Sequence, residues 1–261
     1  MTRCALLIHG MWGTPEVWRN WRAFLEARGW HVLAPALRHH EAPPLGPPPG
    51  LGTAGLDDYA ADLETLLRTL PEKPVIVGHS MGGLIALKLC ARGLVRAGVL
   101  LTPAPPSSVL ALRLSNIAAF ARIERQWGWW RKPHRATLGE AMWHTFNTME
   151  PGEASRLHES FVHDSGRALL EMGLPWLDRS GAARVAPVDV GVPLLLVAGQ
   201  RDRLTPPSVV RRIAARFAKV SDYREYPGQG HWVLGQPGWQ EIAADAAQWM
   251  DRQWQSSTSP S

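Results

Sequence analysis

The 261-residue sequence contains only two cysteines, Cys4 and Cys90. Cys4 lies in an apolar strand-like run and Cys90 in a helix-like run, so both are expected to be small buried side chains. Cysteines placed in this way indicate no disulfide framework and permit a reducing compartment. The amino-terminal segment also has too short an apolar run for the core of a signal peptide. We therefore expect a cytoplasmic protein.

Long apolar runs and blocks of like charge are missing as well. No stretch approaches the ~18 apolar residues of a membrane span, so stable membrane insertion is not expected. The formal net charge is +5, but the arginines are scattered and interleaved with acids. Basic residues concentrate only in residues 125–135. This charge distribution indicates an ordinary surface with one local patch, and no nucleic-acid partner is expected.

Patterns that hold metals or nucleotides are equally absent. No H-E-x-x-H or paired-cysteine pattern occurs, and His39 and His40 are adjacent rather than spaced to share a helix face. No G-x-x-x-x-G-K-[ST] or G-x-G-x-x-G sequence opens a helix. We therefore expect chemistry that needs neither a metal nor a cofactor. Nothing in the sequence specifies the oligomeric state.

Short apolar runs alternate with helical patterns, which is typical of an α/β protein whose mostly parallel sheet is flanked by helices. Residues 105–187 break this alternation: they are expected to form helices without strands and contain five of the 13 tryptophans. We interpret this segment as a helical cap insertion. The core then comprises residues 1–104 and 188–255, and residues 256–261 form a flexible tail. The strands are expected at 4–8, 30–34, 74–77, 97–101, 192–198 and 222–226, and the helices of the core at 15–29, 56–70, 84–92, 207–217 and 240–254.

Residues 78–82 read G-H-S-M-G and match the pattern G-x-S-x-G around Ser80. The pattern is specific where a buried strand precedes it and a helix follows, because the serine sits on a tight, strained turn. Both conditions are met here. Glycines flank the turn because a Cβ there would collide with neighbouring backbone. We therefore predict that Ser80 is a nucleophile rather than an ordinary serine in a glycine-rich turn.

A serine hydroxyl becomes a good nucleophile when a base removes its proton, and an acid must orient that base. His231 lies directly after the last expected strand, in a loop that can reach back over the sheet. Asp202 follows the expected strand at 192–198. The chain order Ser80, Asp202, His231 is the order expected for this geometry. We predict Asp202 as the acid and His231 as the base of a catalytic triad.

Other acids and histidines fit these roles less well. Asp178 and Asp189 precede the strand that leads to Asp202 and therefore lie at its opposite end, and no acid directly follows the strand at 97–101. His79 neighbours the serine, but its side chain is expected to point off the turn. The histidines of the expected loop and cap are interpreted as surface or pocket polar groups; these are His39, His40, His134, His144, His158 and His163.

An oxyanion hole needs two backbone N–H groups directed at the developing negative charge. One is expected from Met81, the residue after the nucleophile. The other is expected from the turn after His9 and Gly10, from Met11 or, failing that, from Trp12.

These motifs together resemble the α/β-hydrolase fold superfamily, in its capped serine esterase and lipase-like branch. The resemblance rests on His9-Gly10, residues 78–83, Gly199-x-x-Asp202-x-x-x-Pro206 and Gly230-His231-Trp232, and it implies a sheet that starts at the family's third strand. Serine at position 80 argues against the dehalogenase and epoxide-hydrolase branches, which use aspartate. Residues 35–40 depart from the Pro-Asp and glycine turn that is usual after the second strand, so the substrate walls there are expected to differ.

The tryptophan-rich cap allows three interpretations. Its tryptophans can form a core that holds the insertion onto the sheet, or an apolar wall that binds the acyl group. They can also form an interfacial surface beside Arg131 and Lys132. For the second interpretation, the predicted substrate-binding residues are Trp12, Trp129 and Trp130.

The sequence thus predicts a serine hydrolase that cleaves carboxylic esters of small to medium, largely apolar substrates through an acyl-enzyme intermediate. Its partner is expected to be a small-molecule ester. A thioesterase or a lactonase would use the same triad. A ligand-binding receptor with slow turnover on the same fold is the alternative of another class.

Overall fold

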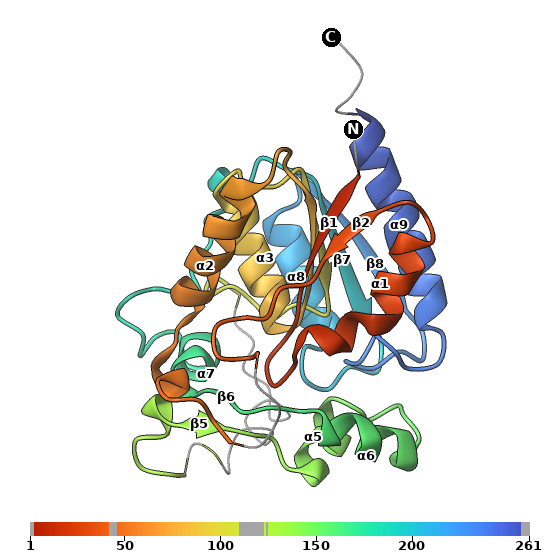
Figure 1. Cartoon of the computed structure of the whole chain (residues 1–261). Coiled ribbons are helices and arrows are strands. Elements are labelled where there is room, and N and C mark those ends of the chain that lie inside the picture. Colours follow the sequence, from red (N-terminus) through yellow and green to blue (C-terminus); the bar gives the residue numbers. More distant parts are fainter. Residues whose placement is uncertain (1–2, 42–45, 110–122, 124, 257–261) are drawn as a thin grey trace.

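The computed structural model describes residues 3–41, 46–109, 123 and 125–256. Six strands form one fully parallel sheet in the order β2-β1-β3-β4-β7-β8 (Figure 1). The expected fold class is confirmed, and each expected strand is found with its ends shifted by at most two residues. The strands are β1 (Cys4–Ile8), β2 (His31–Leu33), β3 (Val75–His79), β4 (Ala97–Leu101), β7 (Leu194–Gly199) and β8 (Ser221–Tyr226).

Helices cover both faces of the sheet because successive side chains of each strand point to opposite faces. In β1, Leu6 and Ile8 pack into one hydrophobic cluster, and Ala5 and Leu7 into another. Helices α2, α3 and α8 contribute to the first cluster, and α1 and α9 to the second (Figure 1). Their bounds are α1 (Arg19–Glu26), α2 (Leu56–Thr69), α3 (Met81–Ala91), α8 (Pro207–Arg216) and α9 (Trp239–Ser256).

The first expected helix, at 15–29, is shorter than predicted and has two parts. A 3-10 turn, η1 (Pro15–Trp18), leads into α1. The helix ends at Glu26, and the chain turns at Gly29, whose φ of 79° suits a residue without a Cβ. Two further 3-10 turns, η2 (Leu51–Thr53) and η4 (Pro187–Asp189), lie in connecting segments.

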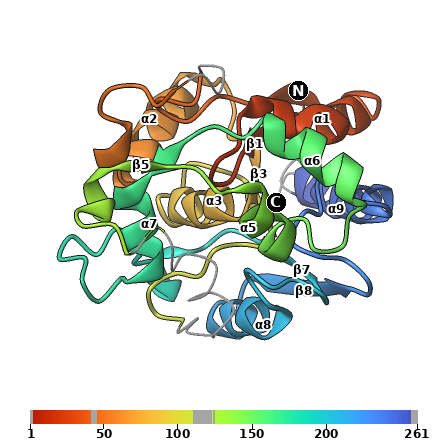
Figure 2. The ribbon, with the colours of Figure 1, turned by 90° about the horizontal axis from the view of Figure 1, so that it is seen from below.

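The described part of residues 105–187 lies against the carboxyl ends of the strands (Figures 1 and 2). The expectation of helices without strands is wrong, because Pro133 and His134 pair with Asp164 and Ser165 as an antiparallel two-stranded sheet. Two-residue strands are too short to give an alternating sequence pattern. The elements of this segment, which we call the cap, are η3 (Trp129–Arg131), β5 (Pro133–His134), α5 (Leu138–His144), α6 (Pro151–Glu159), β6 (Asp164–Ser165) and α7 (Gly166–Gly173). The division of the chain at residues 104 and 187 stays a prediction.

The strand order changes direction between β1 and β3, because β2 lies on one side of β1 and β3 on the other. In open α/β sheets, the crevice at such a switch point is where ligands bind. Ile8 and Gly78 are paired in the ladder, so the loops after β1 and β3 emerge side by side. No helix in the described part of the chain is long and apolar enough to cross a bilayer.

Candidate active site

Ser80 occupies a strained turn between β3 and α3. Its φ of 54° and ψ of −119° are unusual for a residue with a side chain. A Cβ on Gly82 would lie 2.3 Å from the Ile8 carbonyl oxygen, and one on Gly78 would lie 2.2 Å from the Gly82 carbonyl oxygen. Both positions therefore require glycine, and the turn presents the Ser80 side chain at the carboxyl edge of the sheet.

His231 and Asp202 are brought together from two loops at the same edge. Asp202 follows β7 and His231 follows β8, and His231 Nδ1 lies 2.8 Å from Asp202 Oδ2. Both residues are buried. Since the carboxylate accepts a hydrogen bond from Nδ1, the neutral ring carries its proton on Nδ1 and keeps Nε2 as an acceptor.

The Asp202 carboxylate is fully hydrogen-bonded. Oδ1 accepts from the N–H groups of Leu204 (2.7 Å) and Thr205 (2.9 Å), and Oδ2 lies 2.8 Å from Thr205 Oγ1. Burial alone would raise the pKa of Asp202, but the charge of His231 and these hydrogen bonds outweigh it and hold the pKa below its usual value. The carboxylate is therefore ionised at neutral pH and suited to orient the imidazole.

The His231 backbone is fixed by two neighbouring side chains. Its carbonyl oxygen accepts hydrogen bonds from His79 Nε2 at 3.0 Å and from Thr102 Oγ1 at 3.2 Å. Burial lowers the pKa of His79 to about 3, with a further contribution from the charge of His231. His79 is therefore a neutral donor that supports the His231 loop. No sequence pattern indicates this contact, since the two residues are 152 positions apart.

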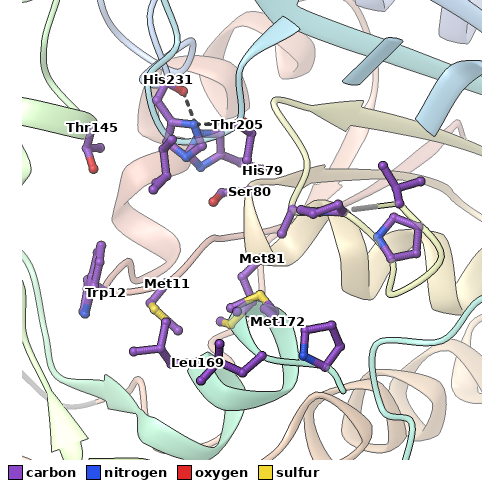
Figure 3. A pocket seen from close by; sticks show the side chains of 18 of the residues that line it. Met11, Trp12, His79, Ser80, Met81, Thr145, Leu169, Met172, Thr205 and His231 are labelled. Carbon is purple, nitrogen blue, oxygen red and sulfur yellow. Dashed lines mark hydrogen bonds between the residues drawn. The ribbon is translucent and has the colours of Figure 1, made fainter. Parts of the chain in front are cut away.

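Ser80 and His231 line the same cavity, which has a volume of about 340 Å³. In Figure 3, Ser80, His79 and His231 gather at one end of the cavity, and Met11, Met81, Leu169 and Met172 at the other. The cavity wall contains no lysine, arginine, aspartate or glutamate among the described residues. Within the same residues, no group of three or more His, Cys, Asp or Glu side chains is arranged to hold a metal ion.

The two residues expected to supply the oxyanion hole, Met11 and Met81, line this cavity together. The loops that carry them are in contact, since a Cβ on Gly10 would lie 3.0 Å from the Ser80 Cβ. The fallback donor, the Trp12 N–H, is already engaged, because it donates to Asp164 Oδ2 at 2.9 Å. Of the two N–H groups expected in this loop, that of Met11 is therefore better suited to the predicted role of oxyanion donor.

The three tryptophans predicted to bind substrate lie in different places. Trp12 is buried and lines the cavity. Trp129 and Trp130 are not part of the described cavity wall. Trp129 is buried behind that wall, packed in one cluster with Leu169. The aromatic residues of the wall that sequence reasoning missed are Phe161, Trp176 and Trp232.

The interpretation of the loop and cap histidines as surface or pocket groups is wrong for three of them. His40, His134 and His144 are buried, and none of the three lines the cavity. His40 instead pairs with Asp164, an acid that sequence reasoning did not single out. No motif could reveal this pair, because the two residues lie 124 positions apart and meet only through the fold of the cap.

A family model described as the alpha/beta hydrolase family matches residues 5–244. Solved structures with the same fold include a methylesterase from Arabidopsis, with a TM-score of 0.71 and 13% identity, over 95% of this chain and 99% of that one. A monoacylglycerol lipase from Paleococcus ferrophilus matches with a TM-score of 0.70 and 20% identity, over 96% of this chain and 94% of that one. At these identities the likeness concerns the fold.

A curated relative shows a local likeness in sequence. It is a pimeloyl-[acyl-carrier protein] methyl ester esterase from Aromatoleum aromaticum, 38% identical over 88 residues. The aligned segment spans 33% of this chain and 31% of the relative.

Proposed function

The chain belongs to the alpha/beta hydrolase family, and on that premise we propose that it is a serine hydrolase that cleaves carboxylic esters through an acyl-enzyme intermediate. One observation carries the proposal: His231, which is held by the buried Asp202, and the strained Ser80 line one end of the same largely apolar cavity. The similar proteins reported above are a methyl ester esterase, a methylesterase and a monoacylglycerol lipase, and these names are consistent with ester cleavage.

The proposed mechanism uses only groups of this chain. His231 Nε2 takes the proton of the Ser80 hydroxyl while Oγ attacks the ester carbonyl carbon. Asp202 stabilises the imidazolium that forms, and the N–H groups of Met81 and Met11 hold the oxyanion. The imidazolium then protonates the leaving alcohol. In the second half, His231 activates a water molecule that attacks the acyl-enzyme and releases the acid.

The character of the cavity defines the proposed substrate. Its described wall is built mainly from methionine, leucine, proline and aromatic side chains, with no charged residue. Burying an unpaired charge there would be unfavourable, because no group of opposite charge compensates the lost hydration. We expect neutral esters with a small to medium apolar acyl group to be preferred over esters of the same size with a distal carboxylate.

Thioesters and lactones can be cleaved by the same groups, so we test them in the same panel. The panel comprises p-nitrophenyl esters of increasing acyl length, a matched thioester, a lactone and a carboxylate-bearing ester. Multiple turnovers of the neutral ester, abolished in Ser80→Ala, support the proposed function. Stoichiometric binding with at most one slow turnover would instead favour a ligand-binding receptor.

A further inference from the structure

The cap holds the loop after β1 through both polar atoms of the Trp12 backbone. The Trp12 N–H donates to Asp164 Oδ2 at 2.9 Å, and the Trp12 carbonyl accepts from the Val162 N–H at 2.9 Å. Trp12 has a φ of 63°, a conformation that a tryptophan adopts only when its surroundings hold it there. These two hydrogen bonds therefore fix the orientation of the peptide groups on either side of Trp12, next to Met11.

Asp164 is itself fixed from the core of the molecule. It lies in β6 and is buried. His40 Nε2 lies 3.1 Å from Asp164 Oδ2, and the Ser165 N–H donates to Oδ1 at 2.6 Å. His40, in the segment after β2, therefore holds Asp164 in place, and Asp164 accepts the hydrogen bond of the Trp12 N–H.

The contacts of His40 define its protonation state. Its Nδ1 lies 2.9 Å from the Arg38 carbonyl oxygen, which can only accept. Its Nε2 faces the Asp164 carboxylate, which accepts N–H donors from Trp12 and Ser165. Both ring nitrogens must therefore donate, so His40 is an imidazolium paired with a carboxylate, with both side chains buried.

We propose that Asp164 and His40 are positioning residues of this enzyme, through which the cap keeps the Met11 N–H directed into the cavity for the oxyanion. The inference rests on the proposed function, in which Met11 supplies one of the two oxyanion donors. Neither residue lines the cavity, so both act through the Met11–Trp12 loop and not on the substrate. The cap is then part of the catalytic machinery as well as a wall for the acyl group.

The pair also makes the arrangement sensitive to alkaline pH. Burial would lower the pKa of His40, but the charge of Asp164 outweighs it and raises the pKa. The two rings that face His40 carry no charge, because burial lowers the pKa of His9 to about 3 and raises the pKa of Tyr59. The negative charge of Glu41 acts in the same direction as that of Asp164 and also raises the pKa of His40. The ion pair is complete below the ordinary histidine pKa of ~6.5 and is lost as the pH rises through the raised pKa. Above it, the neutral ring keeps its proton on the Nε2 that faces the carboxylate, so the lone pair of Nδ1 would face the Arg38 carbonyl oxygen. The loss of this contact and of the ring's charge would weaken the hold on Asp164 and loosen the loop.

The test compares kcat per active site, with the sites counted by a phosphonate that labels the nucleophile. Asp164→Ala should lower kcat about 10- to 100-fold with KM nearly unchanged, since loss of an oxyanion donor costs ~10²–10³-fold and this variant only loosens one. Asp164→Asn keeps an acceptor for the Trp12 N–H and should recover part of the loss. In the parent, kcat should decline at alkaline pH, and this decline should be absent in His40→Gln, because the amide supplies a donor that does not titrate.

Glu171→Ala is the matched control. Glu171 is also a buried cap carboxylate that accepts a core backbone N–H, that of Leu56 at 2.7 Å, and its other oxygen accepts from Arg167 at 2.6 Å. We expect it to lower the melting temperature and leave kcat per site unchanged. An Asp164→Ala enzyme with parental kcat per site, or an equal loss in both variants, would overturn the inference. If Asp164→Ala does not fold, an unchanged alkaline limb in His40→Gln would overturn it. A parent protein that is neither labelled nor active would instead contradict the proposed function.

Discussion

At the scale of single residues, the site depends on carboxylates that are buried without losing their charge. Asp202 is ionised because four donors surround its two oxygens, from His231, Leu204 and the N–H and hydroxyl of Thr205. Asp164 is ionised for a similar reason, with donors from Trp12, His40 and Ser165. Each carboxylate orients a group of the proposed machinery, Asp202 the base and Asp164 the oxyanion loop.

Asp202→Asn should lower kcat about 10⁴-fold, because an amide favours the wrong tautomer of the imidazole while leaving the geometry intact. The measurement is kcat for a neutral p-nitrophenyl ester beside the melting temperature. Asp178→Asn is the control, since Asp178 is another buried carboxylate with several donors, from Ser180, Ala182 and Arg167. A nearly neutral effect of Asp202→Asn would mean that the acid lies elsewhere.

At the scale of elements, the sequence predicts the core well because its patterns are local. Buried parallel strands appear as apolar runs, and both β1 and β4 match their expected ranges. Helix α3 begins at Met81, three residues before its expected start at Leu84. The prediction places the start too late because glycines at 82 and 83 resemble a turn. Both glycines lie within the helix, and close packing leaves no room for a Cβ at either position: one on Gly82 would lie 2.3 Å from the Ile8 carbonyl oxygen, and one on Gly83 would lie 2.8 Å from the Pro103 side chain.

Gly82→Ala should therefore destabilise the protein by about 1–3 kcal/mol or more, since the added methyl would press on the Ile8 backbone, which cannot move away easily. Gly139→Ala is the control: Gly139 lies in α5, and an added Cβ meets nothing within 4 Å. Alanine there should be neutral or stabilising by up to ~1 kcal/mol. Urea unfolding of both variants measures the difference, and equal stability of the two would contradict the proposed packing.

Substitutions of the cap tryptophans should have two kinds of effect, one on stability and one on ester selectivity. Trp129 is buried behind the cavity wall, so Trp129→Ala should lower the melting temperature and change the kcat/KM values for butanoate and octanoate esters in proportion. Trp176 is 58% exposed and lines the cavity, so Trp176→Ala should change the ratio of the two kcat/KM values. The change should be graded, because a fitted methylene is worth only ~1–3 kcal/mol.

Trp127, which is 87% exposed, provides the control for these two variants. Trp127→Ala should alter neither the melting temperature nor the ester ratio in solution. A rise in activity on emulsified ester that this substitution abolishes would support the interfacial interpretation of the cap. An unchanged ratio of the two kcat/KM values in Trp176→Ala would contradict the interpretation of Trp176 as part of the acyl-binding wall.

At the scale of the whole molecule, the site forms where the strand order reverses. The loops after β1, β3, β7 and β8 bring Met11, Ser80, Asp202 and His231 to one edge of the sheet. Chain order and motif context could place these residues at the same edge, because each lies in the loop that follows a parallel strand, and their catalytic roles stay predictions. The supporting contacts were not predictable: His79 with His231, and His40 with Asp164, join segments that carry no shared pattern.

The central claim is that Ser80 is the nucleophile of an ester hydrolase, and covalent trapping tests it most directly. The protein is treated with a small reactive organophosphonate, and the labelled peptide is identified by mass spectrometry while residual ester turnover is followed. We predict one adduct per chain on Ser80, loss of turnover in proportion to labelling, and no labelling of Ser80→Ala, whose kcat should fall by about 10⁴-fold or more. Normal ester turnover by Ser80→Ala, or full inactivation with the adduct on another residue, would contradict the account.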